Sequence, residues 1–159
     1  MKNSYHFVTH WRFRGRREVV YDIVSDSLEY PRWWSTVYLH VEELVHGAED
    51  GLGRRLRLHT KGWLPYELRW EALTTEVLRP RRVAIRAFGD FEGRGIWTFE
   101  QQGDFVNVTF DWEVTAEKPL LKHLSFMFQP LFSANHRWAM EQGRRGLEKE
   151  IGRREGTGA

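Results

Sequence analysis

The sequence predicts an α+β fold in which a curved antiparallel sheet of about seven strands wraps around one long C-terminal helix. Three patterns predict it. An alternating segment opens the chain, residues 37–114 form further alternating runs separated by turn signals, and apolar residues recur at helical spacing near the end. Two short helices are expected after the first strand. Such a sheet must curl to bury its apolar face, and the C-terminal helix is the large partner available.

Length and composition indicate one ordinary globular domain. The 159 residues fit a single domain over 1–154 with a flexible tail at 155–159. A net charge of +2 with acids and bases interspersed argues against a nucleic-acid partner, which usually needs clustered basic residues. The absence of cysteine excludes disulfides, thiolate metal sites and thiol nucleophiles.

A change in the spacing of apolar residues predicts a strand followed by short helices at the start of the chain. Residues 5–13 alternate, which predicts a strand whose odd-numbered side chains, from Tyr5 to Phe13, are buried. Apolar residues within 19–24 then fit one face of a short helix. Asp26 or Ser27 can cap a second short helical piece, which we expect to end at the Tyr30–Pro31 step.

The middle of the chain predicts hairpin-linked strands with one solvent-exposed face. Turn signals recur near 47–53, 62–65, 79–80, 88–90 and 102–104, and each run between them alternates apolar and polar residues. The carboxylates in this region fall between the apolar positions, so strand parity turns them toward solvent. These carboxylates are Glu67, Glu71, Asp111 and Glu113.

The last element reads as one long helix from Pro119 to about Arg154. Apolar or small residues recur there every three or four positions. Because Pro130 lacks an N–H, the regular helix is expected either to begin near it or to kink there. The uncharged stretch 123–136 is too short and too polar to span a bilayer. The N-terminus does not read as a signal peptide, which makes a cytoplasmic location the default expectation.

Several segments resemble one known superfamily. They include the opening from Phe13 to Trp34, with its Tyr30-Pro31-Arg32-Trp33-Trp34 step, the Gly89–Trp97 turn and strand, and the closing Asn135–Gly143 segment. This pattern, which spans nearly the whole chain, resembles the START-like (SRPBCC) superfamily and, within it, the polyketide cyclase/dehydrase and lipid transport branch. The resemblance implies a helix-grip fold with a hydrophobic tunnel for lipids, polyketides or quinones. It implies no family-wide catalytic set.

The function expected is binding of a hydrophobic small molecule, lipid, polyketide-like or quinone-like, between the sheet and the C-terminal helix. An aromatase/cyclase-type or dehydratase-type enzyme using the same cavity is the alternative, and a protein-interaction module is a third. Few polar groups among many apolar ones are typical of small-molecule pockets. The residues expected to line the cavity are Trp34, Leu58, Tyr66, Leu68, Trp70, Ile85, Trp97, Phe99, Phe110, Trp112, Phe128, Phe132, Asn135, His136 and Met140.

His136 is the sharpest candidate within that set. It can be a packed histidine bonded to Tyr66 or to the backbone, a ligand contact, or, with Tyr66, a catalytic group. No cofactor is expected. No metal is expected either, since His6 and His10 are too far apart on their strand to share one ion.

Trp63 stands with Leu64 and Pro65 at the tip of a predicted hairpin. The apolar tip is either incidental, a lid over the cavity, or a point of transient contact with a membrane surface.

Overall fold

The computed structural model describes residues 4–117 and 119–156, with side chains up to 117 and from 130 to 155. Seven strands, three α-helices and one 3-10 helix follow one another within these ranges. Their bounds are β1 (Ser4–Arg14), α1 (Arg17–Ser25), η1 (Ser27–Glu29), α2 (Tyr30–Trp33), β2 (Tyr38–Val45), β3 (Arg55–Lys61), β4 (Glu67–Leu78), β5 (Arg82–Gly89), β6 (Phe91–Gln102), β7 (Phe105–Ala116) and α3 (Pro119–Gly156).

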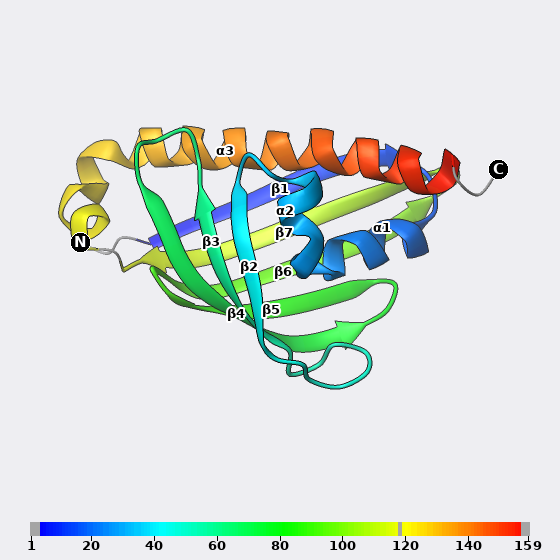
Figure 1. Cartoon of the computed structure of the whole chain (residues 1–159). Helices are drawn as coiled ribbons and strands as arrows, with labels where there is room; N and C mark the ends of the chain where they lie inside the picture. The colour runs from blue at the N-terminus through cyan, green and yellow to red at the C-terminus, as the bar shows by residue number, and fades with distance from the viewer. Residues whose placement is uncertain (1–3, 118, 157–159) are drawn as a thin grey trace.

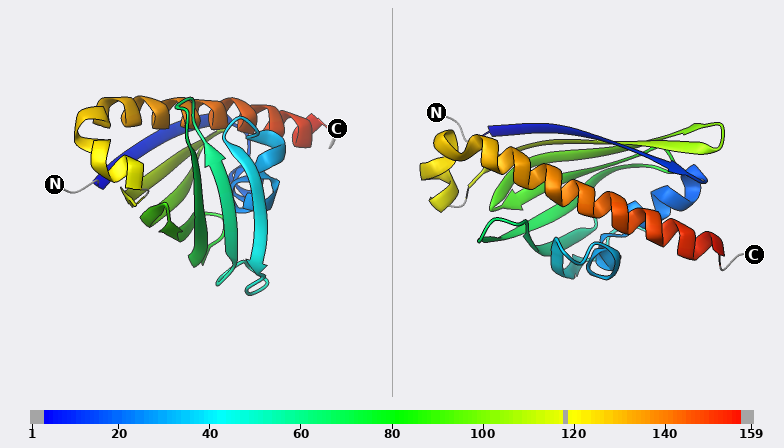
Figure 2. Two further views of the ribbon diagram at one scale, coloured as in Figure 1. Left: turned by 60° about the vertical axis from the view of Figure 1, so that its left-hand side comes forward. Right: turned by 90° about the horizontal axis from the view of Figure 1, so that it is seen from above.

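The seven strands form one antiparallel sheet in the order β1-β7-β6-β5-β4-β3-β2, which confirms the predicted sheet. The sheet curls, and α3 lies along its open side (Figure 1). Seen from above, the helix runs obliquely across the strands, with α1 and α2 near its C-terminal end (Figure 2). The sheet therefore holds the helix against its concave face, as the helix-grip fold requires.

Strand alternation sorts side chains between the two faces of this sheet. In β7, every even-numbered position from Val106 to Ala116 is buried against the concave side. The acidic residues of the strands lie on the convex side, where Asp111 of β7 is 2.9 Å from His6 and Glu71 of β4 is 2.6 Å from Arg55. The convex carboxylates thus belong to surface ion pairs.

The second short helix differs from the expectation. The turn η1 comes first, and α2 begins at Tyr30 instead of ending there. Pro31 fits because the first-turn N–H groups of a helix have no partner inside the helix. Asp26 precedes η1 but makes no side-chain capping bond. The Tyr30 hydroxyl instead donates to the Val24 carbonyl, which ties α2 to the end of α1.

Two glycines let α2 approach α3 closely. A Cβ on Gly143 would lie 2.5 Å from the Trp34 indole, and one on Gly146 would lie 1.9 Å from the Trp33 carbonyl oxygen. The Trp34 Nε1 donates to the Ala139 carbonyl at 2.9 Å, which fixes the ring against the helix. The short helix therefore closes one end of the grip.

A buried carboxylate on α3 also holds α2 in place. Glu150, 3% exposed, accepts bonds from both Arg32 terminal nitrogens at 2.9 and 2.7 Å, and also from Arg153 and Arg154. These guanidinium groups, Arg32 first, hold the pKa of Glu150 well below its usual range. Full pairing of this kind is what a buried charge needs in order to be tolerated.

The long helix continues through Pro130 but does not run straight. Its first turns stand at a steep angle to the rest (Figure 1). Pro130 cannot donate to the carbonyl four residues earlier, so a bend close to it has a direct cause. Of the two alternatives for this proline, the structure shows a helix that begins earlier and bends. No helix in the described ranges is long and apolar enough to cross a membrane.

Candidate functional site

A cavity of about 100 Å³ lies between the concave face and α3. It sits where the first residues of β1, the last of β7 and the β3–β4 hairpin face the N-terminal half of the helix. The mixture of ring faces and a few hydrogen-bonding groups suits a neutral organic molecule. The lining residues are Tyr5, Phe7, Val37, Thr60, Lys61, Gly62, Tyr66, Leu68, Phe91, Trp112, Val114, Ala116, Phe132, Asn135, His136 and Ala139.

His136 presents an unused nitrogen in this cavity. Its ring stacks on Phe7 with centroids 4.2 Å apart. Its Nε2 is buried and has no hydrogen-bond partner among the described residues. Burial, together with the neighbouring charge of Arg137, lowers the pKa of His136 to about 4. The imidazole is therefore neutral at pH 7 and can exchange a hydrogen bond with a bound molecule.

Tyr66 supplies a second neutral group. Burial, with a smaller contribution from Tyr5, raises the pKa of its phenol to about 12. Phe132 lies between the two tyrosines, with ring centroids 5.9 Å from Tyr5 and 6.2 Å from Tyr66 in edge-to-face geometry. The phenol of Tyr66 is thus protonated, and α3 holds an aromatic edge against it.

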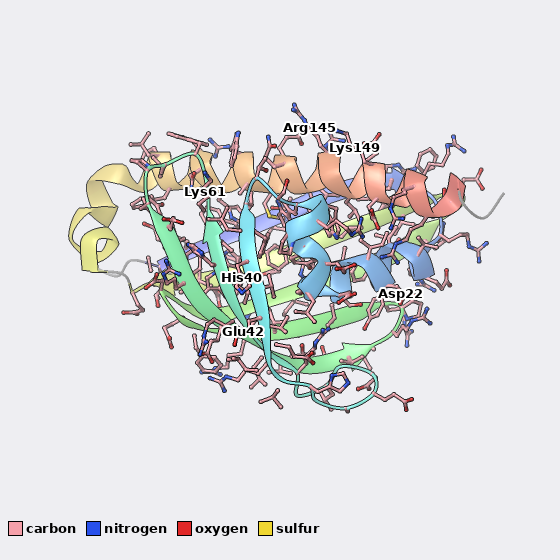
Figure 3. All side chains as sticks on the ribbon, in the orientation of Figure 1. Asp22, His40, Glu42, Lys61, Arg145 and Lys149 are labelled. Atoms are coloured by element: carbon pink, nitrogen blue, oxygen red, sulfur yellow. The ribbon has the colours of Figure 1, made fainter. Side chains whose placement is uncertain are left out.

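Lys61, the charged side chain among the lining residues, lies at the margin of the cavity. Lys61 is exposed, and Figure 3 shows it at the end of β3 nearest to α3. The other lining side chains are uncharged at neutral pH. Nor do the described residues include a group of three or more histidine or acidic side chains placed to hold a metal. The cavity therefore favours an uncharged ligand.

Asn135 ties the β3–β4 hairpin to α3. Its Oδ1 accepts hydrogen bonds from the backbone N–H of Trp63 at 2.8 Å and of Leu64 at 3.2 Å. Gly62 makes this approach possible, because a Cβ there would lie 2.0 Å from the same oxygen. Asn135 also lines the cavity. Holding the hairpin tip, which covers the cavity, is therefore its most evident role in this structure.

An open groove of about 740 Å³ lies outside the hairpin tip. Tyr66, Gly62 and Lys61 border both the groove and the inner cavity. Trp63, 46% exposed, and Trp138 add apolar surface to the groove. The tip thus separates a small inner cavity from a larger outer groove.

A second, smaller cavity of about 40 Å³ lies further along the concave face, beneath η1 and α2. The predicted site residues divide between the two cavities and the packed core. The inner cavity is lined by Tyr66, Leu68, Trp112, Phe132, Asn135 and His136, and the second by Leu58, Trp70, Ile85, Trp97 and Phe110. Trp34, Phe99 and Met140 are buried in the core, and the side chain of Phe128 lies outside the described residues.

Several lining residues were absent from the predicted set. Tyr5 and Phe7 stand on the odd face of β1, which alternation had already assigned to the interior, so parity could have found them. Phe91 opens β6 directly after the Gly89 turn. It belongs to the inner cavity because the β5–β6 hairpin ends beside the β4 strand, where Trp70 faces Gly89. No local sequence pattern carries that information.

Comparison with known proteins agrees with this geometry. The family described as polyketide cyclase / dehydrase and lipid transport matches residues 9–152. A search of curated protein sequences gave no match.

Several solved structures share the fold. The Thermus thermophilus protein TTHA0849 has a TM-score of 0.76 at 18% identity over 92% of this chain and 97% of that one. A Streptomyces Zhui aromatase/cyclase has a TM-score of 0.75 at 16% identity over 95% of each chain. A START superfamily protein from Mycobacterium smegmatis has a TM-score of 0.69 at 17% identity over 93% and 97%.

The sheet, the gripped helix and the cavity between them define a START-like helix-grip protein. More specifically, the chain belongs to the polyketide cyclase / dehydrase and lipid transport family, since the family match covers most of its length. The resemblance in the sequence is thereby confirmed. At these identities the solved structures establish the fold alone.

Proposed function

We propose that the protein binds a neutral, largely apolar small molecule in the inner cavity, oriented by His136 and Tyr66. The buried Nε2 of His136, which has no hydrogen-bond partner among the described residues, is the observation that carries the proposal. An unsatisfied buried polar atom costs on the order of 1–3 kcal/mol, and a ligand carbonyl or hydroxyl would remove that cost. The surrounding rings supply the apolar contact area.

Titration of intrinsic fluorescence with a neutral ketone such as 2-octanone tests this proposal. Trp112 lines the cavity, so ligand binding should quench tryptophan emission in a saturable way. His136→Ala should weaken binding by about tenfold, because one hydrogen bond and one ring contact are lost. Val8→Ala, on the exposed convex face, serves as the matched control and should leave the affinity unchanged.

The proposal fails if no apolar molecule of this kind quenches the emission, or if His136→Ala binds as tightly as the wild type. Extraction of the purified protein with organic solvent, followed by mass spectrometry, gives a second readout. It would identify any molecule that the protein retains from its source.

An aromatase/cyclase-type or dehydratase-type reaction is the second candidate function. The placement of His136 and Tyr66 in one cavity favours it, because the imidazole could take a proton from the carbon beside a carbonyl while the Tyr66 phenol donates to the oxygen. Deuterium exchange into the α-position of 2-octanone, followed by NMR, tests this step. Exchange that is faster with the wild type than with His136→Gln supports catalysis, and equal rates leave binding as the function.

A further inference from the structure

The boundary between the two cavities crosses the sheet at one level. On β3, Thr60 lines the inner cavity and Leu58 the second one. On β4 the same division falls between Leu68 and Trp70. In the sheet register Thr60 pairs with Leu68, and Leu58 pairs with Trp70. The two cavities are thus successive levels of one groove, divided by side chains.

The dividing side chains are the indoles of Trp70 and Trp112. Their ring centroids are 5.5 Å apart, and the Phe91 ring contacts both, at 5.9 and 5.6 Å. The Trp112 ring lies against Gly95, where a Cβ would come within 2.9 Å of it. Both indoles are also buried, at 6% and 5% exposure. Together the three rings close the inner cavity on the side that faces the second cavity.

One hydrogen bond fixes the partition. The Trp70 Nε1 donates to the Thr60 Oγ1 at 3.1 Å in a buried setting. This bond links a residue of the inner cavity to a residue of the second one, and therefore crosses the boundary itself. A buried indole N–H needs an acceptor, so rotation of the ring out of the partition would leave it unpaired.

The enclosed space is small for a ligand pocket. Drug-sized ligand pockets have volumes of roughly 300–1,000 Å³, and a cavity of about 150 Å³ holds one benzene ring. The inner cavity measures about 100 Å³. Between Trp70 and the hairpin tip there is consequently room for a group smaller than a benzene ring, such as a short chain.

We propose that Trp70, held by Thr60, sets the length of ligand that the inner cavity accepts. The ligand class is then a neutral ketone or similar molecule whose buried part is a short acyl chain. Long lipid chains and fused polycyclic systems cannot pass Trp70 into the second cavity. The inference rests on the proposed binding function and adds the size class of the ligand.

Binding of a homologous series of methyl ketones, from 2-pentanone to 2-tridecanone, measures the length of ligand that the inner cavity accepts. Each buried methylene should raise affinity by about fourfold. For the wild type we expect the affinity to rise over the shorter members and then to level off, because further methylenes stay in the open groove. In Trp70→Leu the levelling should move to longer chains by at least two carbons, since the two cavities then join.

Two further variants make the result specific. Thr60→Val removes only the acceptor. It should shift the break, the chain length at which the affinity levels off, in the same direction by a smaller amount. It also keeps the test decisive if Trp70→Leu, checked by circular dichroism, fails to fold. Phe13→Leu is the control, because Phe13 is an equally buried aromatic residue that lines neither cavity, and its break should match the wild type.

The outcomes separate the two proposals. If the wild type binds none of the ketones, the binding function itself is wrong. If the wild type binds them but its affinity rises without a break, or if Trp70→Leu and Thr60→Val both keep the wild-type break, the partition is wrong and binding stands.

Discussion

His136 combines two properties that follow from its position in α3. The Phe7 ring covers one face of the imidazole, and the cavity receives its Nε2, which no other described residue bonds. Removal from water disfavours the charged form, so the group stays neutral through the physiological range. A neutral imidazole can accept or donate a hydrogen bond, according to its tautomer, and thus suits a carbonyl or a hydroxyl equally.

This residue should make the protein less stable in mild acid. The pKa of His136 is about 4 when folded and 6.5 ordinarily, so the unfolded chain binds the proton first as the pH falls. The stability is present above pH 6.5 and is lost as the pH falls toward 4, by on the order of 3 kcal/mol. Urea unfolding across that range should show this slope in the wild type.

His136→Gln cannot take up the proton and should flatten the slope. His40→Gln, which removes an exposed histidine on β2, should keep the wild-type slope. Identical slopes for all three proteins would mean that the buried imidazole is not the group responsible.

At the scale of elements, the contact between α2 and α3 depends on the missing side chains of two glycines. Alanine in place of glycine normally stabilises a helix interior by up to about 1 kcal/mol. At Gly146 the added Cβ would lie 1.9 Å from the Trp33 carbonyl oxygen, so the contact would have to open. We therefore expect the sign of the substitution to be reversed there.

Gly146→Ala should lower the free energy of unfolding by roughly 1–3 kcal/mol, the usual cost of overpacking. Gly152→Ala in the same helix meets no atom of the described residues within 4 Å and should raise it by up to about 1 kcal/mol. Urea unfolding of the two variants measures both. Stabilisation by Gly146→Ala would show that the helices do not pack this closely.

The β3–β4 hairpin should control passage into the inner cavity. Asn135→Ala removes the acceptor for two backbone N–H groups, at about 1 kcal/mol each. The tip should open more often, and both association and dissociation of 2-octanone should accelerate by about fivefold or more. Stopped-flow tryptophan fluorescence gives both rates.

Asn135→Asp keeps an oxygen acceptor at the same position and should retain rates close to the wild type. If Asn135→Ala exchanges ligand at the wild-type rate, passage does not run past the hairpin tip.

At the scale of the whole molecule, alternation predicted the sheet and its faces. The inward positions of β3, β4 and β7 were all assigned correctly, because a strand has only two faces. Their division between two cavities was not predictable. It depends on where Trp70 and Trp112 lie along the groove and on the Trp70–Thr60 bond between neighbouring strands. The role of Asn135 was equally hidden, since its partners are backbone groups 71 and 72 residues away.

Ligand binding should stabilise the whole domain, because the inner cavity is formed by the sheet and α3 together. At a free ligand concentration of 100 times Kd, the free energy of unfolding should rise by about 2.7 kcal/mol. Urea unfolding with and without 2-octanone measures this gain. Tyr66→Ala should reduce the gain at the same ligand concentration, whereas Val8→Ala should not. A saturating ligand that leaves the unfolding curve unchanged would contradict binding to the folded state.

The aromatic rings of the core also form a continuous chain of ring contacts. Neighbouring ring centroids lie 4.1 to 6.0 Å apart from Trp34 through Trp11, Trp97, Phe110 and Trp112 to Trp70. Indoles that are neighbours, or that are separated by one ring as Trp97 and Trp112 are by Phe110, exchange excitation energy directly before they emit. Light absorbed by any of these tryptophans can therefore migrate to Trp112, beside the inner cavity. A quencher bound there would lower the emission of all these tryptophans, and the loss of emission would exceed the share of one tryptophan.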